Sequence, residues 1–212
     1  MEFPPEFQYN LGSPIEYANR QGLLGKTAGG LMGAGPTGDK AERTERVLGA
    51  VQRHFPDNPN AQAAIMGNIK GENHRFNYQE IEGEDVATKG YGLFQFTGPQ
   101  RDAYFRYLNA TGLQDNEDTQ VGYFKSLIYS KNPEHEIGPV NQDRIREQIN
   151  TGAVQDISDV ITHRYENPRN LAEAQATRGG YSQGFSEQLG LPSPGKMSQT
   201  PRKPFGAMTK NQ

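Results

Sequence analysis

From about residue 39 to residue 55, apolar residues recur every three or four positions, as on the buried face of an amphipathic helix. These positions are Val47, Leu48, Val51 and Phe55. Thr37–Asp39 supply good N-cap residues ahead of the segment, and Pro56 and Pro59 close it. The pattern predicts a first amphipathic helix that packs on the rest of the domain.

A second helical pattern follows these prolines. Asn60 is placed to cap a helix over about residues 61–70, in which Ala64, Ile65 and Ile69 face inward. Gly71 then breaks the pattern. Glu72 is therefore expected at the end of the second helix.

The period changes between residues 75 and 96. Aromatic and aliphatic residues are separated there by acidic and polar ones, Gly83 offers a turn, and residues 90–96 read GYGLFQF. A short aromatic run interrupted by glycines is typical of a small hairpin or an irregular lobe. We expect one small β-lobe at this point.

The rest of the patterned region returns to helical spacing. Pro99 suits the first turn of a helix that Gly112 would end. The helices expected from here on cover residues 100–109, 118–130, 141–150, 155–166 and 169–177. The predicted fold class is α+β, mostly helical, with the small β-lobe inserted early and extended irregular arms on either side.

Two arms flank this domain. Residues 1–40 and 190–212 are rich in Gly, Pro, Ser, Thr and Gln, and they have too little apolar content to fold alone. We predict three parts: a flexible N-terminal arm over 1–40, a folded domain over 41–189 and a basic Pro/Gly-rich arm over 190–212. Isolated apolar residues in the arms are expected to dock into grooves of partner proteins.

Composition and charge narrow the range of ligands and locations expected for the chain. The net charge is −3, although residues 190–212 carry four basic side chains and no acidic one, so the remainder is acidic. An acidic domain makes nucleic acid an unlikely ligand, since phosphate neutralisation supplies most of that affinity. The chain has no cysteine, and no apolar run approaches the roughly 20 residues needed to span a bilayer. We expect neither a membrane span nor a signal peptide.

Glu72 is the candidate for acid chemistry. Cleavage of a glycosidic bond needs a carboxyl group that is still protonated near neutral pH, usually because apolar or aromatic neighbours raise its pKa. A glutamate at the end of a buried helix, facing Tyr91 and Phe94, fits that need. Spacing alone leaves open an ordinary solvated glutamate.

Two motifs carry a family resemblance. Residues 63–72 read AAIMGNIKGE, and residues 90–101 read GYGLFQFTGPQR. Asp118–Gln120 and the stretch from Tyr165 through Pro168 to Arg178 and Tyr181 add to the pattern. Over about residues 47–185 the chain resembles the phage tail lysozyme family, within the lysozyme and lytic transglycosylase superfamily. The resemblance implies a lysozyme-like fold.

The resemblance also implies site residues. Glu72 matches the catalytic glutamate, and Gln95 matches a glutamine that lines the cleft and binds substrate. Tyr91 and Phe96 form the aromatic lobe, and Thr97 joins them as a substrate-binding candidate. Asn73 stands where the family usually has serine; we expect it to bind substrate too, although the change leaves full activity open.

A second carboxylate would come from the acidic turn in the lobe. Glu82 and Glu84 are our candidates there, with Glu80 and Asp85 close by. A lytic transglycosylase needs no second carboxylate, so hydrolysis and anhydro-sugar formation both stay open. Glu166 is expected to fix local structure, with a role in the cleft as the alternative. No cofactor and no metal ion are expected, because the four histidines show no metal-ligand spacing.

The function implied by the resemblance is cleavage of the MurNAc–GlcNAc β-1,4 linkage of bacterial peptidoglycan. The enzyme would be carried in the phage tail or inside the virion and would open the host's periplasmic cell wall during infection. Other virion or tail proteins would hold it through the arms. The alternative is a structural tail adaptor or plug that keeps the lysozyme fold without strong activity.

Overall fold

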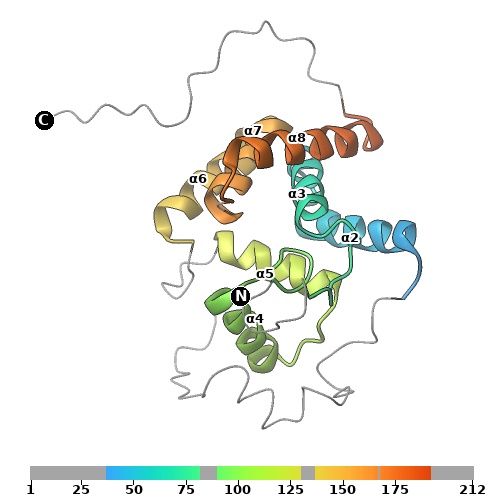
Figure 1. The fold of residues 1–212 in the computed structure, drawn as a ribbon, viewed down its shortest axis with the longest axis vertical. Coiled ribbons are helices and arrows are strands. Elements are labelled where there is room, and N and C mark those ends of the chain that lie inside the picture. The colour runs from blue at the N-terminus through green and yellow to red at the C-terminus, as the bar shows by residue number, and fades with distance from the viewer. Residues whose placement is uncertain (1–36, 82–89, 130–136, 167, 192–212) are drawn as a thin grey trace, which may run out of the picture.

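The computed structural model describes residues 37–81, 90–129, 137–166 and 168–191 (Figure 1). Nearly all of both predicted arms lies outside these ranges. The helices are α2 (Lys40–His54), α3 (Pro59–Glu72), α4 (Gly98–Thr111), α5 (Glu117–Tyr129), α6 (Pro139–Thr151), α7 (Val154–Ile161), the π-helical turn η1 (Thr162–Glu166) and α8 (Leu171–Gln188). The prediction of a mostly helical domain is confirmed.

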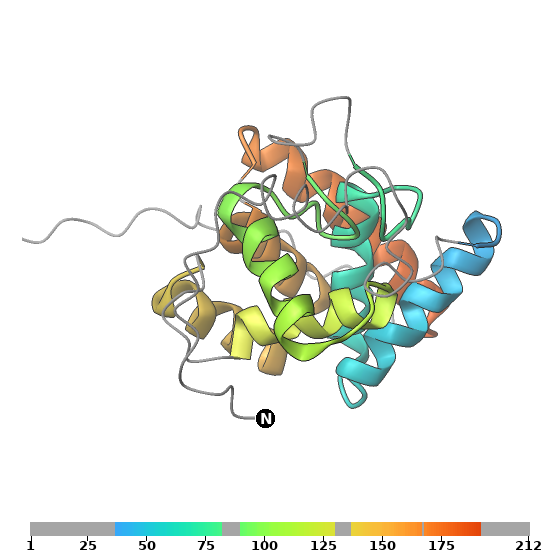
Figure 2. The same cartoon turned by 90° about the horizontal axis from the view of Figure 1, so that it is seen from below.

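Helix α3 is the centre of the fold. It packs against α2, α6, α7 and, most extensively, α8, and the two perpendicular views both place it among the other helices (Figures 1 and 2). Every residue from Ala61 to Ile69 is buried. A helix without a polar face is buried on all sides. The position of Glu72 at the end of α3 is thereby fixed from several directions.

Small residues let α8 lie close to α3. A Cβ atom added to Gly67 would lie 2.4 Å from the main-chain nitrogen of Ser182. One turn later, a Cβ atom on Gly71 would lie 2.7 Å from Cγ of Arg178. The two glycines therefore bring the backbone of α8, and with it the side chain of Arg178, onto the end of α3.

The N-terminus of α2 agrees with the sequence prediction, whereas the N-terminus of α3 differs from it. Asp39 caps α2 in a capping box with Glu42, as expected from the N-cap residues before that helix. Helix α3 begins earlier than predicted, because Asn58 accepts a hydrogen bond from the nitrogen of Ala61 at 2.8 Å. Pro59 then takes the first turn, where its missing N–H costs nothing. The predicted cap at Asn60 is wrong.

The last two predicted helices differ in their ends. The α-helical part of the segment 155–166 stops at Ile161, and η1 continues it. The helix predicted over 169–177 runs on to Gln188, through Gly179 and Gly180. Gly179 is buried against the side chain of Gln155, where a Cβ atom would lie 2.4 Å from Nε2. Tertiary packing thus outweighs the low helix propensity of glycine there.

The predicted β-lobe is not seen as strands in the described residues. Residues 90–96 instead form a tight loop with isolated antiparallel bridges, Ile81 to Tyr91 and Tyr91 to Phe96. Gly92 and Gln95 have positive φ angles of 77° and 47°, which turn the chain too sharply for a strand. We call residues 90–96 the aromatic loop.

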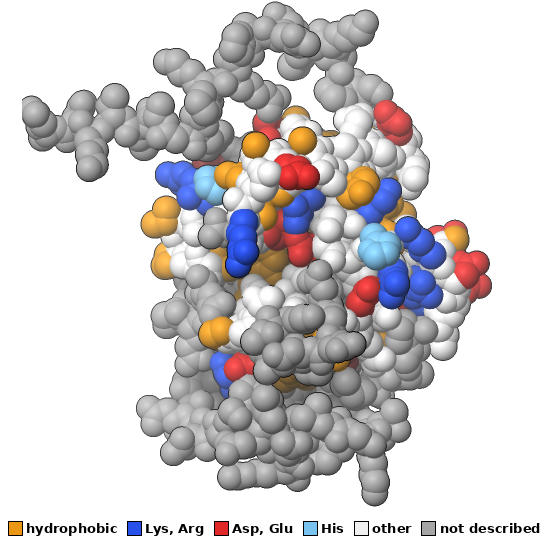
Figure 3. All heavy atoms as spheres, in the orientation of Figure 1, with side chains coloured by type: hydrophobic (Ala, Val, Ile, Leu, Met, Phe, Trp, Pro, Cys, Tyr) orange, Lys and Arg blue, Asp and Glu red, His pale blue; other side chains and the backbone are white. Residues whose placement is uncertain are grey.

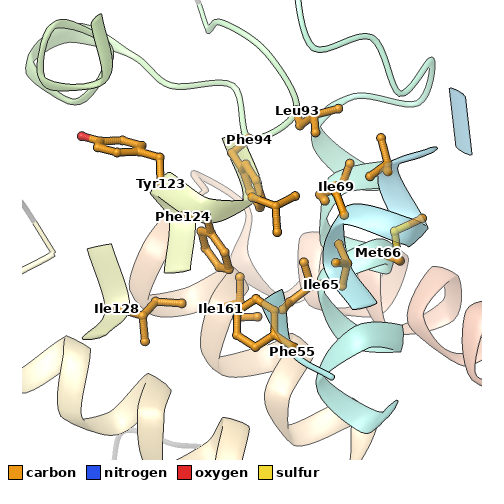
Figure 4. Packing of buried hydrophobic residues seen from close by; sticks show 14 of the residues in the cluster. Phe55, Ile65, Met66, Ile69, Leu93, Phe94, Tyr123, Phe124, Ile128 and Ile161 are labelled. Carbon is orange, nitrogen blue, oxygen red and sulfur yellow. The ribbon is translucent and has the colours of Figure 1, made fainter. Parts of the chain in front are cut away.

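The aromatic loop is part of the core. Figure 4 shows Leu93 and Phe94 directed toward Ile69 of α3 and Phe124 of α5. The rings of Phe94 and Phe124 are stacked with centroids 4.4 Å apart. Burial of these rings fixes the loop beside the end of α3, without the ladder of a sheet.

Candidate active site

Glu72 is the last residue of α3, and its side chain is 22% exposed. It therefore lies between the buried part of α3 and the surface, where a bound chain could reach its carboxyl group. The space-filling view shows acidic and basic side chains next to each other in a hollow near the middle of one face, with hydrophobic side chains at its base (Figure 3).

Arg178 of α8 connects two carboxyl groups. Its Nη2 pairs with Oε1 of Glu72, and its Nε lies 2.6 Å from Oε2 of Glu166 in η1. The side chains of Arg178 and Glu166 are only 10% and 6% exposed. Burial raises the pKa of Glu166 to about 8 and lowers the pKa of Arg178. We call these three residues the Glu72–Arg178–Glu166 triad.

The sequence did not predict this triad. Glu166 was expected to fix local structure, with a role in the cleft as the alternative, and the structure places it on the guanidinium that Glu72 also contacts. Arg178 was part of the family pattern, yet no role followed from it. Glu72 and Arg178 are 106 positions apart, so no local pattern could have paired them.

Asn73 is buried, with 1% of its surface exposed, and binds inside the protein. Its Nδ2 donates to the main-chain oxygens of Asn77 at 2.7 Å and Gly92 at 3.0 Å, and its Oδ1 accepts from the nitrogen of Asn77 at 3.2 Å. The side chain ties the end of α3 to the aromatic loop. These contacts support a role in holding the loop; the predicted contact with substrate stays a prediction.

Tyr91 points into a buried polar network instead of outward. Its hydroxyl and that of Tyr104 both donate to the carboxylate of Asp115. Gln120 also donates to Asp115, at 2.9 Å, and accepts from the nitrogen of Leu93 at 2.8 Å. Burial raises the pKa of Asp115, although these hydrogen bonds oppose the rise. The network anchors the aromatic loop to α4 and α5.

The other predicted substrate-binding residues divide by burial. Phe96 is fully buried, and Gln95 is 9% exposed and donates to the oxygen of Gly92 at 2.8 Å. Thr97 is exposed at the start of α4. Of this group, Thr97 is the side chain that is open to a ligand in the structure.

The predicted second carboxylates, Glu82 and Glu84, lie outside the described residues, as does Asp85. Glu80 is described, with its Oε1 3.6 Å from Nη1 of Arg75 and its side chain 21% exposed. The described ranges contain no cluster of three His, Asp or Glu residues able to hold a metal ion. They also contain no helix that is long and apolar enough to cross a membrane.

A helical domain with a partly exposed glutamate at the end of its central helix, beside a buried aromatic loop, is consistent with a lysozyme-like fold. The family model described as phage tail lysozyme matches residues 50–189, and the chain belongs to this family. A lysozyme-type glycosidase activity on peptidoglycan is what this family membership indicates. No curated protein matches the chain.

Proposed function

We propose that the protein cleaves the β-1,4 linkage between N-acetylmuramic acid and N-acetylglucosamine, with Glu72 as the general acid. The observation that carries this proposal is the place of Glu72, partly exposed at the end of the central helix and held by Arg178. An acid fixed by a rigid helix can be presented to a sugar chain in one orientation, which proton transfer requires.

In the proposed reaction, Glu72 gives its proton to the glycosidic oxygen as the bond from that oxygen to the anomeric carbon breaks. Positive charge then develops at the anomeric carbon. In a hydrolase, water attacks this carbon after activation by a second carboxylate, for which Glu82 and Glu84 remain the candidates. In a lytic transglycosylase, a hydroxyl group of the substrate closes on the same carbon and gives its proton to the Glu72 carboxylate.

The aromatic loop supports the reaction mainly by its shape. Asn73, Tyr91, Gln95 and Phe96 are buried and bound within the protein, so we infer that they hold the wall of the site. Thr97, which is exposed, is the member of the predicted set that we assign to direct contact with sugar.

We further propose that the enzyme is carried on the virion and opens the host cell wall locally during infection. The family description, phage tail lysozyme, supports this setting. Attachment through the arms, residues 1–40 and 190–212, is part of the proposal. The partners would be other tail or virion proteins.

The test is the Glu72→Gln variant, assayed on purified peptidoglycan. Loss of a general acid lowers the rate by about 10²–10⁴-fold, and the melting temperature should stay within a few degrees. The matched control is Glu187→Gln, an exposed glutamate of α8, which should keep full activity. Full activity of Glu72→Gln would refute the assignment. A wild-type protein that cleaves no peptidoglycan would favour the structural adaptor.

Mass spectrometry of the released fragments distinguishes the two routes. Hydrolysis gives products with a reducing end, each one water heavier than the anhydro products of a transglycosylase. If reducing ends form, Glu82→Gln and Glu84→Gln identify the second carboxylate by which of them loses activity.

A further inference from the structure

The Glu72–Arg178–Glu166 triad has two carboxyl groups and one guanidinium. Arg178 contacts Glu72 through Nη2 and Glu166 through Nε, so both acids pair with the same planar cation. Glu72 is partly exposed, whereas Glu166 is almost wholly buried. Only Glu72 is placed to reach a substrate.

We propose that Glu166 is a positioning residue for Glu72: through Arg178 the two carboxyl groups share one positive charge, and ionisation of Glu166 lets Glu72 take up the proton that it donates. This inference rests on the proposed function of Glu72. Glu166 itself touches no substrate.

The charge on Glu166 controls how strongly Arg178 acts on Glu72. A guanidinium in contact with a carboxylate stabilises its ionised form, which is the wrong form for a general acid. When Glu166 is also ionised, the positive charge of Arg178 is balanced, and protonation of Glu72 becomes easier. When Glu166 is neutral, the full charge of Arg178 acts on Glu72. The two carboxyl groups therefore titrate as a coupled pair.

Burial of Glu166 sets the pH range in which this coupling acts. Because desolvation raises the pKa of Glu166 to about 8, that group changes its charge near neutral pH instead of near pH 4. Below about pH 8 Glu166 is neutral and the full charge of Arg178 acts on Glu72, whereas above about pH 8 the ionised Glu166 balances that charge.

Several other charged or titratable groups lie on the neighbouring elements. Lys70 of α3 lies over the ring of Tyr181, 4.4 Å from its centroid, and Asp159 of α7 accepts from Gln155 at 2.7 Å. Burial lowers the pKa of His163 in η1, so it stays neutral above pH 6.5. The remaining ones on α6, α7, η1 and α8 are Asp143, Arg144, Arg146, Glu147, Asp156, Arg164, Glu173 and Glu187.

The first test compares wild type with Glu166→Gln from pH 5 to pH 9. Glutamine keeps the shape of the side chain but cannot ionise. Near pH 5, where Glu166 is protonated in wild type, the two rates should be similar. Above pH 8 the variant should be slower by about tenfold or more, because a charge at contact range changes protonation by about one pH unit or more. Glu187→Gln is the control and should follow wild type at every pH.

A purely structural role for Glu166 predicts a different result. The loss would then be the same at every pH, and it would accompany a lower melting temperature. Such a pH-independent ratio, or full activity of Glu166→Gln at pH 9, would overturn the proposal while leaving Glu72 as the acid. Absence of wild-type activity would instead contradict the proposed function.

A second test needs no activity and uses wild-type protein. NMR titration of ¹³C-labelled glutamate carboxyl groups should show the Glu72 signal moving twice, once with its own protonation and once as Glu166 titrates. In Arg178→Gln the Glu72 midpoint should rise, because the cation is gone. A single Glu72 transition in wild type, with no inflection near pH 8, would overturn the coupling even if Glu166→Gln fails to fold.

Discussion

Substitution of Gly67 by alanine tests the close packing of α3 against α8. The new Cβ atom would lie 2.4 Å from the main-chain nitrogen of Ser182 and 2.6 Å from its Cα. A flexible side chain could rotate away, but the backbone of a helix cannot, so α8 must shift. The hydroxyl of Ser182 also binds Ser158 at 3.1 Å, and the shift would stretch this buried hydrogen bond.

The loss of stability in Gly67→Ala is the sum of opposing effects. Overpacking of a tight core costs about 1–3 kcal/mol, and a weakened buried hydrogen bond adds about 1 kcal/mol. The better helix propensity of alanine returns at most about 1 kcal/mol. The net loss is therefore about 2 kcal/mol, which corresponds to a fall of about 4–8 °C in the melting temperature of a domain of this size.

Thermal unfolding followed by circular dichroism measures this fall. The matched control is Gly180→Ala in α8, where the residue is exposed and nothing lies within 4 Å of the added Cβ atom. That variant should be more stable than wild type by up to about 1 kcal/mol, from helix propensity alone. A Gly67→Ala protein that melts at or above the wild-type temperature would refute the packing argument.

Two further substitutions separate stability from activity. In Gly71→Ala the new Cβ atom meets the flexible side chain of Arg178 instead of backbone. We expect a loss of less than about 1.5 kcal/mol in the free energy of unfolding, but at least a tenfold fall in the cleavage rate. Wild-type activity of this variant would contradict the proposed role of the triad. Asn73→Ala removes the hydrogen bonds to the oxygens of Asn77 and Gly92 and leaves the nitrogen of Asn77 without its side-chain acceptor, so unfolding should become easier by about 1–3 kcal/mol, whereas an unchanged melting temperature with a raised KM would instead indicate a direct contact with sugar.

Helices were predictable from the sequence where local signals agree. Asp39 and Glu42 form a capping box within one turn, and the apolar face of α2 repeats at helical spacing. Asn58 was missed as the cap of α3 because Asn60 is an equally good cap residue by type. Only the choice of Pro59 for the first turn distinguishes them.

The aromatic loop could not be predicted in the same way. Glycines beside aromatic residues suggest a hairpin, since both occur in tight β-structures. What decides the outcome is Asp115, a residue beyond the next helix, which binds the hydroxyls of Tyr91 and Tyr104. Because the buried carboxylate accepts hydrogen bonds from both hydroxyls, side-chain contacts hold the loop in place. The backbone hydrogen bonds of a strand pair are not needed.

Within the candidate site, the sequence predicted Glu72, where a helix end and a family motif coincide. It did not predict the pairing of Glu72 with other charged residues. The roles of Arg178 and Glu166 depend on how closely α8 approaches α3, which Gly67 and Gly71 set from a different part of the chain. A glycine pair four residues apart gives no sign of its partner helix. The pairing of distant charges was therefore out of reach of local patterns.

The end of α3 supplies one more influence on the proton of Glu72. As the last helical residue, Glu72 lies at the negative end of the helix dipole, which disfavours a carboxylate by about 0.3–1 kcal/mol. Arg178 acts in the opposite direction and is the stronger of the two, because it is in direct contact. An isolated Glu72–Arg178 pair would thus leave the acid ionised. When Glu166 is ionised, this second carboxylate on Arg178 restores the balance, and that effect is the benefit that offsets the cost of burying Glu166.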